Sequence, residues 1–228
     1  MKKPTLPVLR TVVIALSALA LGACATNRPA ADYTAFKAAR PASILVLPPV
    51  NNSPDIAATY SMMSQATVPL AESGYYVFPV TLVDETFKHN GLTSPPDIHA
   101  VAPAKLRQIF GADAALYITV KQYGTSYAIL ASETRVTADA RLVDLRSGAI
   151  LWNGSATASS AEGDSGGGDL VSMLVKAAIR QIVETISSQG HIIAARTSGR
   201  LLSAGMPNGI LYGPRSPMYL KEGMPASR

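Results

Sequence analysis

The sequence predicts an α/β (α+β) domain with a mixed sheet, parallel at first and then extended by antiparallel hairpins, with helices packed on it. Two observations lead to this expectation. Apolar runs alternate with helical segments between residues 43 and 120, which is typical of parallel strands joined by helices. Between residues 127 and 155, strand patterns follow one another without helices, which is typical of antiparallel hairpins.

The first predicted strand, residues 43–47, is apolar at successive positions, as expected for a strand buried on both faces. A segment of turn-forming residues then leads into a predicted helix over residues 56–73. Pro69 predicts a kink or a restart inside this helix, because proline lacks the backbone N–H that a helix needs. Gly74 ends the helix, and residues 75–80 form the second predicted strand.

Two shorter helices and a third strand follow. Residues 81–89 are predicted as a short helix and residues 91–96 as a loop. The second helix, residues 103–110, has a proline at its start and a glycine just past its end, which suits both termini. Residues 114–120 are apolar and predict the third strand.

The later part of the domain is predicted to be a run of strands, over residues 127–131, 134–145 and 149–155. Apolar and polar residues alternate along 134–145, which indicates a strand with one wetter face. After a glycine-rich loop, an apolar stripe at helical spacing predicts a helix over residues 169–188.

The N-terminal segment has the pattern of a bacterial lipoprotein signal peptide. Its first ten residues carry three basic side chains and no acid, and residues 11–21 are apolar and uncharged. This run is too short to span about 30 Å of hydrocarbon but suits a signal-peptide core. It ends in Leu21-Gly22-Ala23-Cys24, which resembles a lipobox, and the resemblance implies cleavage before Cys24 and acylation (palmitate-type chains) of that cysteine.

The alternative, an ordinary secretory signal, leaves a free thiol in an oxidising compartment, so we favour the lipoprotein. A single acyl chain binds a membrane only marginally, whereas several chains hold a protein stably. In proteobacterial lipoproteins an aspartate after the lipidated cysteine favours the inner membrane. Ala25 stands there instead, which implies the outer membrane with the domain facing the periplasm, and leaves surface exposure open.

Four segments are therefore expected. They are a signal peptide (1–23), a lipidated tether (24–42), a periplasmic α/β domain (43–190) and a Pro/Gly-rich C-terminal tail (191–228). The last 30 residues contain five glycines and four prolines, so they are expected to lack regular structure. Their apolar side chains are expected to pack on the domain or on a second subunit.

Composition excludes several classes of protein. The 228 residues contain one cysteine, which excludes an intrachain disulfide scaffold and a zinc site built on two or more thiolates. Removing residues 1–23 takes three of the 20 basic residues and no acid, which leaves 17 against 15 acidic residues, a net charge of +2. Without a basic cluster, no nucleic-acid partner is expected.

Motifs for catalysis are weak. The string Gly163-Asp164-Ser165-Gly166-Gly167 matches the nucleophile region of trypsin-like proteases, but His89 and His99 lack the context of a general base there. We expect a flexible linker instead. The three histidines, His191 being the third, have no metal-binding spacing, and the acids and arginines of residues 139–146 are expected to form cross-strand ion pairs. We therefore expect no enzyme, no catalytic residue, no metal and no cofactor; Cys24 is the one predicted site residue.

Five strings occur in the same order as in one known family: ASILVLPP (42–49), GYYVFPV (74–80), KLRQIFGADAALYI (105–118), QYGTSY (122–127) and ARLVDLRSGAILW (140–152). Over about residues 40–215, the chain resembles outer-membrane lipoproteins of unknown function typified by a neisserial vaccine-antigen candidate. More remotely, the opening strand and the last hairpin are similar to the curli-secretion lipoprotein and to the N-terminal domain of the Tol-system propeller protein.

The resemblance implies a periplasmic α/β domain, often dimeric, with no known catalytic role and with a curli-secretion-like lipoprotein as a plausible partner. Our first hypothesis is a non-catalytic binding or assembly module for envelope or secretion proteins, forming a homodimer through its tail. One alternative is an oligomeric subunit of a curli-type secretion channel, which needs apolar membrane hairpins. Another is a hydrolase that uses Ser165.

Overall fold

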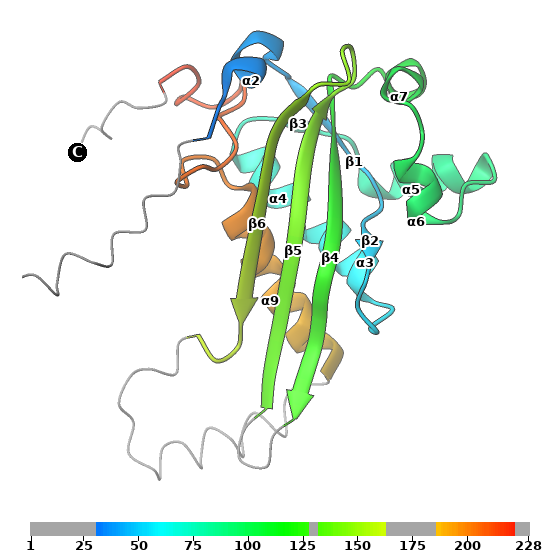
Figure 1. The fold of residues 1–228 in the computed structure, drawn as a ribbon, viewed down its shortest axis with the longest axis vertical. Coiled ribbons are helices and arrows are strands. Elements are labelled where there is room, and N and C mark those ends of the chain that lie inside the picture. Colours follow the sequence, from blue (N-terminus) through cyan, green and yellow to red (C-terminus); the bar gives the residue numbers. More distant parts are fainter. Residues whose placement is uncertain (1–30, 128–131, 163–185, 222–228) are drawn as a thin grey trace, which may run out of the picture. The chain divides into compact units, whose positions relative to one another are not determined.

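A six-stranded mixed sheet organises the chain (Figure 1). The computed structural model describes residues 31–127, 132–162 and 186–221. The chain divides into two units, Met1–Ala31 and Asp32–Arg228, and every element described below belongs to the second. Its strands are β1 (Ser43–Val46), β2 (Val50–Asn51), β3 (Tyr76–Val77), β4 (Ala114–Tyr127), β5 (Ser132–Asp144) and β6 (Ile150–Ser159).

The order of the strands is β3-β1-β4-β5-β6, with β2 also paired to β4. β1 runs parallel to β3 and to β4, and β2 runs parallel to β4. β5 runs antiparallel to β4 and to β6. The predicted fold class, a sheet that is parallel first and antiparallel later, is confirmed. Parallel pairing arises where helices carry the chain back between strands, and antiparallel pairing arises where short turns join them.

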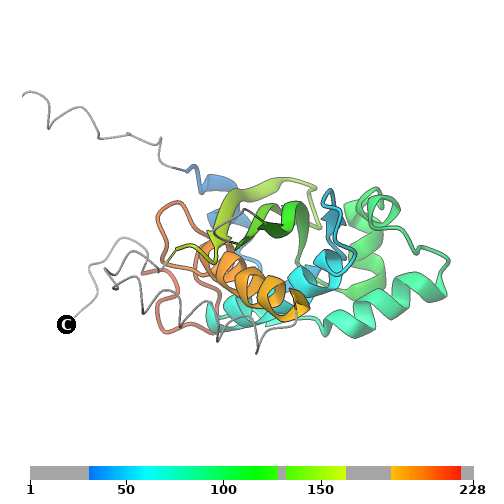
Figure 2. The ribbon, with the colours of Figure 1, turned by 90° about the horizontal axis from the view of Figure 1, so that it is seen from below.

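The helices are distributed unevenly about the sheet. They are α2 (Thr34–Ala39), α3 (Ala58–Gln65), α4 (Thr67–Glu72), α5 (Val80–His89), α6 (Pro95–His99), α7 (Pro103–Phe110) and α9 (Ile186–Leu202). α3 and α9 lie together beneath β4–β6, while α5, α6 and α7 stand beside β1 and β2 (Figures 1 and 2). The front face of β4–β6 in Figure 1 carries no described helix.

Alternation along β5 explains this arrangement. Val136, Ala138 and Leu142 are fully buried on the side of α9, whereas Arg141 on the other side is exposed. A strand sends successive side chains to opposite faces, so one apolar set anchors the helices and one polar set faces outward.

The expected break between residues 114–120 and 127–131 is wrong, because β4 is one strand from Ala114 to Tyr127. The mostly polar residues from Lys121 to Ser126 interrupt the apolar pattern, but the backbone from Gln122 onward pairs with β5. An irregularity between Val120 and Gln122 shifts the register once. Pairing with β5 therefore makes this segment a strand, although its own sequence pattern does not predict one. Residues 128–131 lie outside the described residues.

The predicted interruption of the 56–73 helix is confirmed, three residues before the proline. α3 ends at Gln65 and α4 begins at Thr67. This position follows from the proline ring of Pro69, which clashes with the carbonyl four residues earlier. The predicted loop at 91–96 already contains the first residues of α6, whose Pro95 suits the first turn of a helix.

Two terminal segments are more ordered than expected. Part of the expected tether forms α2, whose Phe36 is buried in the core. Most of the predicted helix at 169–188 lies outside the described residues, but α9 continues to Leu202. Residues 191–202, expected in the C-terminal tail, are therefore helical, because Ile193 and Leu201 bury their side chains in the core.

The segment after α9 packs on its own domain. Trp152 Nε1 donates a hydrogen bond to the carbonyl of Asn208 (2.9 Å), and the Tyr75 hydroxyl donates one to the carbonyl of Leu211 (2.5 Å). Ile210 is buried in the core. The backbone N–H of Gly213 donates to the carbonyl of Ser73 (2.8 Å). These contacts bury apolar residues of the segment within the same chain.

Asp113 ties together three parts of the fold just before β4. Its Oδ2 accepts hydrogen bonds from the backbone N–H groups of Ala42 (3.0 Å) and Ser43 (3.2 Å) and from the Ser43 hydroxyl (3.0 Å). Its Oδ1 lies 3.1 Å from a guanidinium nitrogen of Arg146, in the β5–β6 turn. One carboxylate thus joins the start of β1, the start of β4 and the hairpin.

We predict that Asp113→Asn destabilises the domain by about 1–2 kcal/mol at pH 7. Burial acts to raise the pKa of Asp113. Hydrogen bonds from Ala42 and Ser43 and the charge of Arg146 lower it by more, so the pKa of this carboxyl lies below its usual value. The stabilisation that the ionised Asp113 contributes is fully present above the pKa that this group has in the unfolded chain. It is lost as the pH falls through the lower pKa of Asp113 in the folded protein. Urea unfolding at pH 6 and pH 3 should therefore show a smaller deficit at pH 3. The exposed Glu72→Gln is the control, and a deficit independent of pH would contradict the assignment.

Candidate functional site

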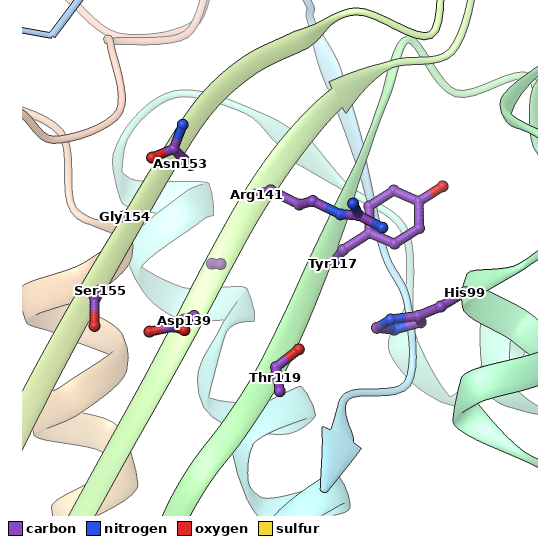
Figure 3. A pocket seen from close by; sticks show the side chains of 9 residues that line it. His99, Tyr117, Thr119, Asp139, Arg141, Asn153, Gly154 and Ser155 are labelled. Atoms are coloured by element: carbon purple, nitrogen blue, oxygen red, sulfur yellow. The ribbon is translucent and has the colours of Figure 1, made fainter. Parts of the chain in front are cut away.

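An open groove runs across the uncovered face of β4, β5 and β6 (Figure 3). Its volume is about 650 Å³. We call it the sheet groove, and its lining residues are His99, Tyr117, Thr119, Asp139, Ala140, Arg141, Asn153, Gly154 and Ser155.

Strand register builds this groove from two rows of side chains. Arg141 of β5 stands opposite Tyr117 of β4 on one side and opposite Asn153 of β6 on the other. Asp139 likewise stands between Thr119 and Ser155. These residues are two apart along each strand, so they share the outward face.

Arg141 is held by aromatic stacking. Its guanidinium carbon lies 4.7 Å from the centroid of the Tyr117 ring. The imidazole of His99 meets the same ring edge-on, with the centroids 5.1 Å apart. Tyr117 is buried, so its ring is a fixed platform for the guanidinium. Arg141 therefore presents a charged, oriented group on an exposed face.

Asp139 and His99 have fixed charge states in the groove. The Lys121 ammonium lies 2.9 Å from the Asp139 carboxylate, and hydrogen bonds from Lys121 and Ser155 hold the Asp139 pKa below its usual value. Burial lowers the pKa of His99, and the charge of Arg141 acts in the same direction, against a smaller upward effect of the hydrogen bond to Pro48. The His99 Nε2–H donates that bond to the Pro48 carbonyl oxygen (3.0 Å). Asp139 is thus ionised and His99 neutral at pH 7.

Gly154 leaves room for the Trp152 indole on the core side of β6. Trp152 lies two residues before it on β6, with its indole across Gly154 on the core side. A Cβ at Gly154 would overlap the indole carbons Cζ2 and Cη2. The absence of a side chain therefore allows Trp152 to reach the carbonyl of Asn208.

The predicted site residue Cys24 and the residues considered for catalysis or metal binding do not come together in the described structure. Cys24 and the string around Ser165 lie outside the described residues. His89 is exposed on α5, with Nε2 3.9 Å from Glu85 Oε2. His99 lines the sheet groove, and His191 lies on α9. Over residues 31–127, 132–162 and 186–221, no group of three His, Cys, Asp or Glu side chains could hold a metal ion.

A contact between a serine and a histidine, which the sequence did not predict, lies on the opposite side of the sheet from the groove. Ser61 Oγ is 2.9 Å from His191 Nδ1 and accepts a hydrogen bond from the Tyr123 hydroxyl (3.0 Å). Gln65 Nε2 lies 2.5 Å from His191 Nε2. Ser61 is buried, and the contact joins α3, β4 and α9, so it is a tie between elements.

The sheet groove was also missed from the sequence. The expected cross-strand ion pairing is confirmed for Asp139, which pairs with Lys121 of β4, whereas Arg146 pairs with Asp113, just before β4. The available signal was the alternation along β5. It places Asp139 and Arg141 on one face but gives no information on their cross-strand neighbours.

Comparison with known proteins identifies the family. The family model described as "Putative lipoprotein GNA1162-like" matches residues 31–215. The chain belongs to this lipoprotein family. It is 50% identical over 209 residues to the lipoprotein NMB1124/NMB1162 of Neisseria meningitidis serogroup B, covering 91% of this chain and 97% of that protein. The predicted family resemblance is confirmed.

Two solved structures are similar to this chain. The crystal structure of lipoprotein GNA1162 from Neisseria meningitidis is 56% identical, with a TM-score of 0.51, and covers 64% of this chain and all of that chain. A PelC dodecamer from Paraburkholderia phytofirmans is 15% identical, with a TM-score of 0.42, covering 81% of this chain and 96% of that chain. Within the described part of the chain, none of the helices has the length and apolar character needed to cross a membrane.

We predict that Gly154→Ala destabilises the domain by about 1–3 kcal/mol, because the added methyl group displaces the Trp152 indole and its hydrogen bond to Asn208. The matched control is Gly199→Ala in α9, where a Cβ meets nothing within 4 Å. There we expect stabilisation by about 0.5–1 kcal/mol. Urea unfolding followed by Trp152 fluorescence measures both, and equal effects of the two changes would refute the packing argument.

Proposed function

We propose that this protein is an outer-membrane lipoprotein, anchored by acyl chains on Cys24, whose periplasmic domain binds another envelope protein without catalysing a reaction. Membership of a lipoprotein family supports the anchor. The observation that carries the binding role is the sheet groove, a preformed hollow on the side of the sheet opposite α9.

The charge states in the groove suit binding better than proton transfer. Asp139 is stabilised as a carboxylate by Lys121, and arginine stays protonated in proteins. His99 is neutral and commits its Nε2–H to the carbonyl of Pro48. Burial raises the pKa of Tyr117 more than the charge of Arg141 lowers it. A general acid or base works best with a pKa near the ambient pH, whereas these groups keep one state.

The spacing between anchor and domain supports a partner near the membrane. α2 begins at Thr34, ten residues after Cys24. Even a fully extended chain of this length reaches only roughly 35 Å. A domain anchored in this way samples the zone next to the bilayer, where envelope proteins and their periplasmic loops lie.

The packing of β4 and β5 argues against the alternative of a curli-type channel subunit. Such a subunit would place the apolar side of a hairpin against lipid. In the described residues that side is already buried, with Val136, Ala138 and Leu142 in the core beneath α9.

We predict that Cys24→Ala releases the protein from the outer-membrane fraction. Without the cysteine sulfur there is no acceptor for the acyl chains, and stable anchoring needs more than one chain. Sucrose-gradient fractionation of cell envelopes measures the distribution, with Ala25→Asp as the sorting control, expected in the inner-membrane fraction. Unchanged outer-membrane recovery of Cys24→Ala would disprove the lipid anchor.

We also predict that in-cell crosslinking of the tagged, anchored protein recovers a defined envelope protein, identified by mass spectrometry and lost with Cys24→Ala. A crosslink between two copies only would instead support a self-contained homodimer. Detergent-resistant rings would revive the channel alternative. Either result would contradict the binding-module proposal.

A further inference from the structure

We propose that the sheet groove recognises a carboxylate on an acidic peptide segment of the partner protein, with Arg141 as the residue that binds it. This inference rests on the proposed function and names the chemistry of the partner.

Charge balance leaves Arg141 as the cation available to a ligand. On this face of the described residues, Lys121 pairs with Asp139 and Arg135 pairs with Glu133. Arg141 takes part in neither pair and contacts the face of Tyr117 instead. The groove itself therefore contributes one positive charge beyond the pair formed by Asp139 and Lys121.

Stacking prepares the guanidinium for a planar, two-oxygen ligand. Arginine offers five N–H donors in a fixed fork that matches a carboxylate in a bidentate manner. The Tyr117 ring, braced by His99, orients that fork before a ligand arrives. Less side-chain entropy is then lost on binding, which strengthens the contact.

Neighbouring polar groups suit the rest of a peptide. Asn153 stands directly across from Arg141 on β6, and both side chains are exposed. Its amide can donate to and accept from a peptide backbone. Thr119, on the other side of β5, adds a hydroxyl (Figure 3). A peptide lying across the strands would meet these groups in turn.

The same charges favour a carboxylate over a phosphate. A phosphate monoester carries about −1.5 to −2 charges at pH 7 and is usually recognised by clusters of arginines. Here a single unpaired arginine shares the face with the ionised Asp139, two residues away on β5. One carboxylate neutralises Arg141, whereas the second negative charge of a dianion meets no further unpaired cation among the described residues of this face and adds to the repulsion by Asp139.

The test uses the full lipidated chain in detergent micelles and fluorescein-labelled pentapeptide amides, Ala-Gly-Glu-Gly-Ala and its glutamine counterpart. Fluorescence anisotropy should show saturable binding of the glutamate peptide and about tenfold weaker binding of the glutamine peptide. Arg141→Gln should remove this preference, and Arg141→Lys should weaken binding to an intermediate level. The matched control is Arg135→Gln, which removes an exposed arginine of the same strand and should leave binding unchanged.

Three outcomes would overturn the proposal: equal binding of the two peptides, equal binding by wild type and Arg141→Gln, or stronger competition by inorganic phosphate than by acetate. Urea unfolding of each variant shows whether a loss of binding reflects a loss of folding. In-cell crosslinking separates the two proposals. A partner recovered equally by Arg141→Gln refutes the groove alone, whereas no partner with the wild type refutes the binding function.

Discussion

The pairing of β4 on both of its edges is the constraint on which the rest of the structure depends. One edge pairs with β1 and β2 in parallel, and the other pairs with β5 over the whole strand. Its residues Leu116, Ile118 and Val120 are fully buried. Because β4 joins the parallel half to the antiparallel half, a one-residue change in its register would turn its own buried side chains to the other face and change its pairing with both halves. Asp113, just before β4, fixes that register with hydrogen bonds to the start of β1 and an ion pair to the following hairpin.

This constraint also produces the candidate site. The apolar side chains of β5 point toward α9, and their burial in the core stabilises the fold. Because side chains alternate along a strand, Asp139 and Arg141 must then point outward. Only the pairing with β4 and β6 places Tyr117 beneath Arg141 and Asn153 beside it. The groove is thus formed on rigid strands, which hold binding groups more precisely than loops do.

The two ends of the described chain close the fold on the far side of this sheet. The Tyr33 hydroxyl, just before α2, donates a hydrogen bond to the carbonyl of Gly209 (2.6 Å), and Trp152 donates one to the carbonyl of Asn208. Phe36 and Ile210 are both buried in the core. The segment around α2 and the segment that follows α9 therefore stabilise each other.

Some helices and strands could be predicted from the sequence alone, because neighbouring residues in the chain carry the pattern that forms them. Pro103 and Gly111 set both ends of α7, and the alternation of apolar and polar residues predicted β5 and the hairpin that follows it. The family resemblance and the prediction of an anchor at Cys24 also come from the sequence alone. The second half of β4, the helical state of residues 191–202 and the sheet groove could be recognised only in the tertiary structure. Gln122–Ser126 become strand because β5 pairs with them, and Arg141 is held in one orientation because register places it over Tyr117. These features depend on contacts between residues far apart in the chain, which no local pattern encodes.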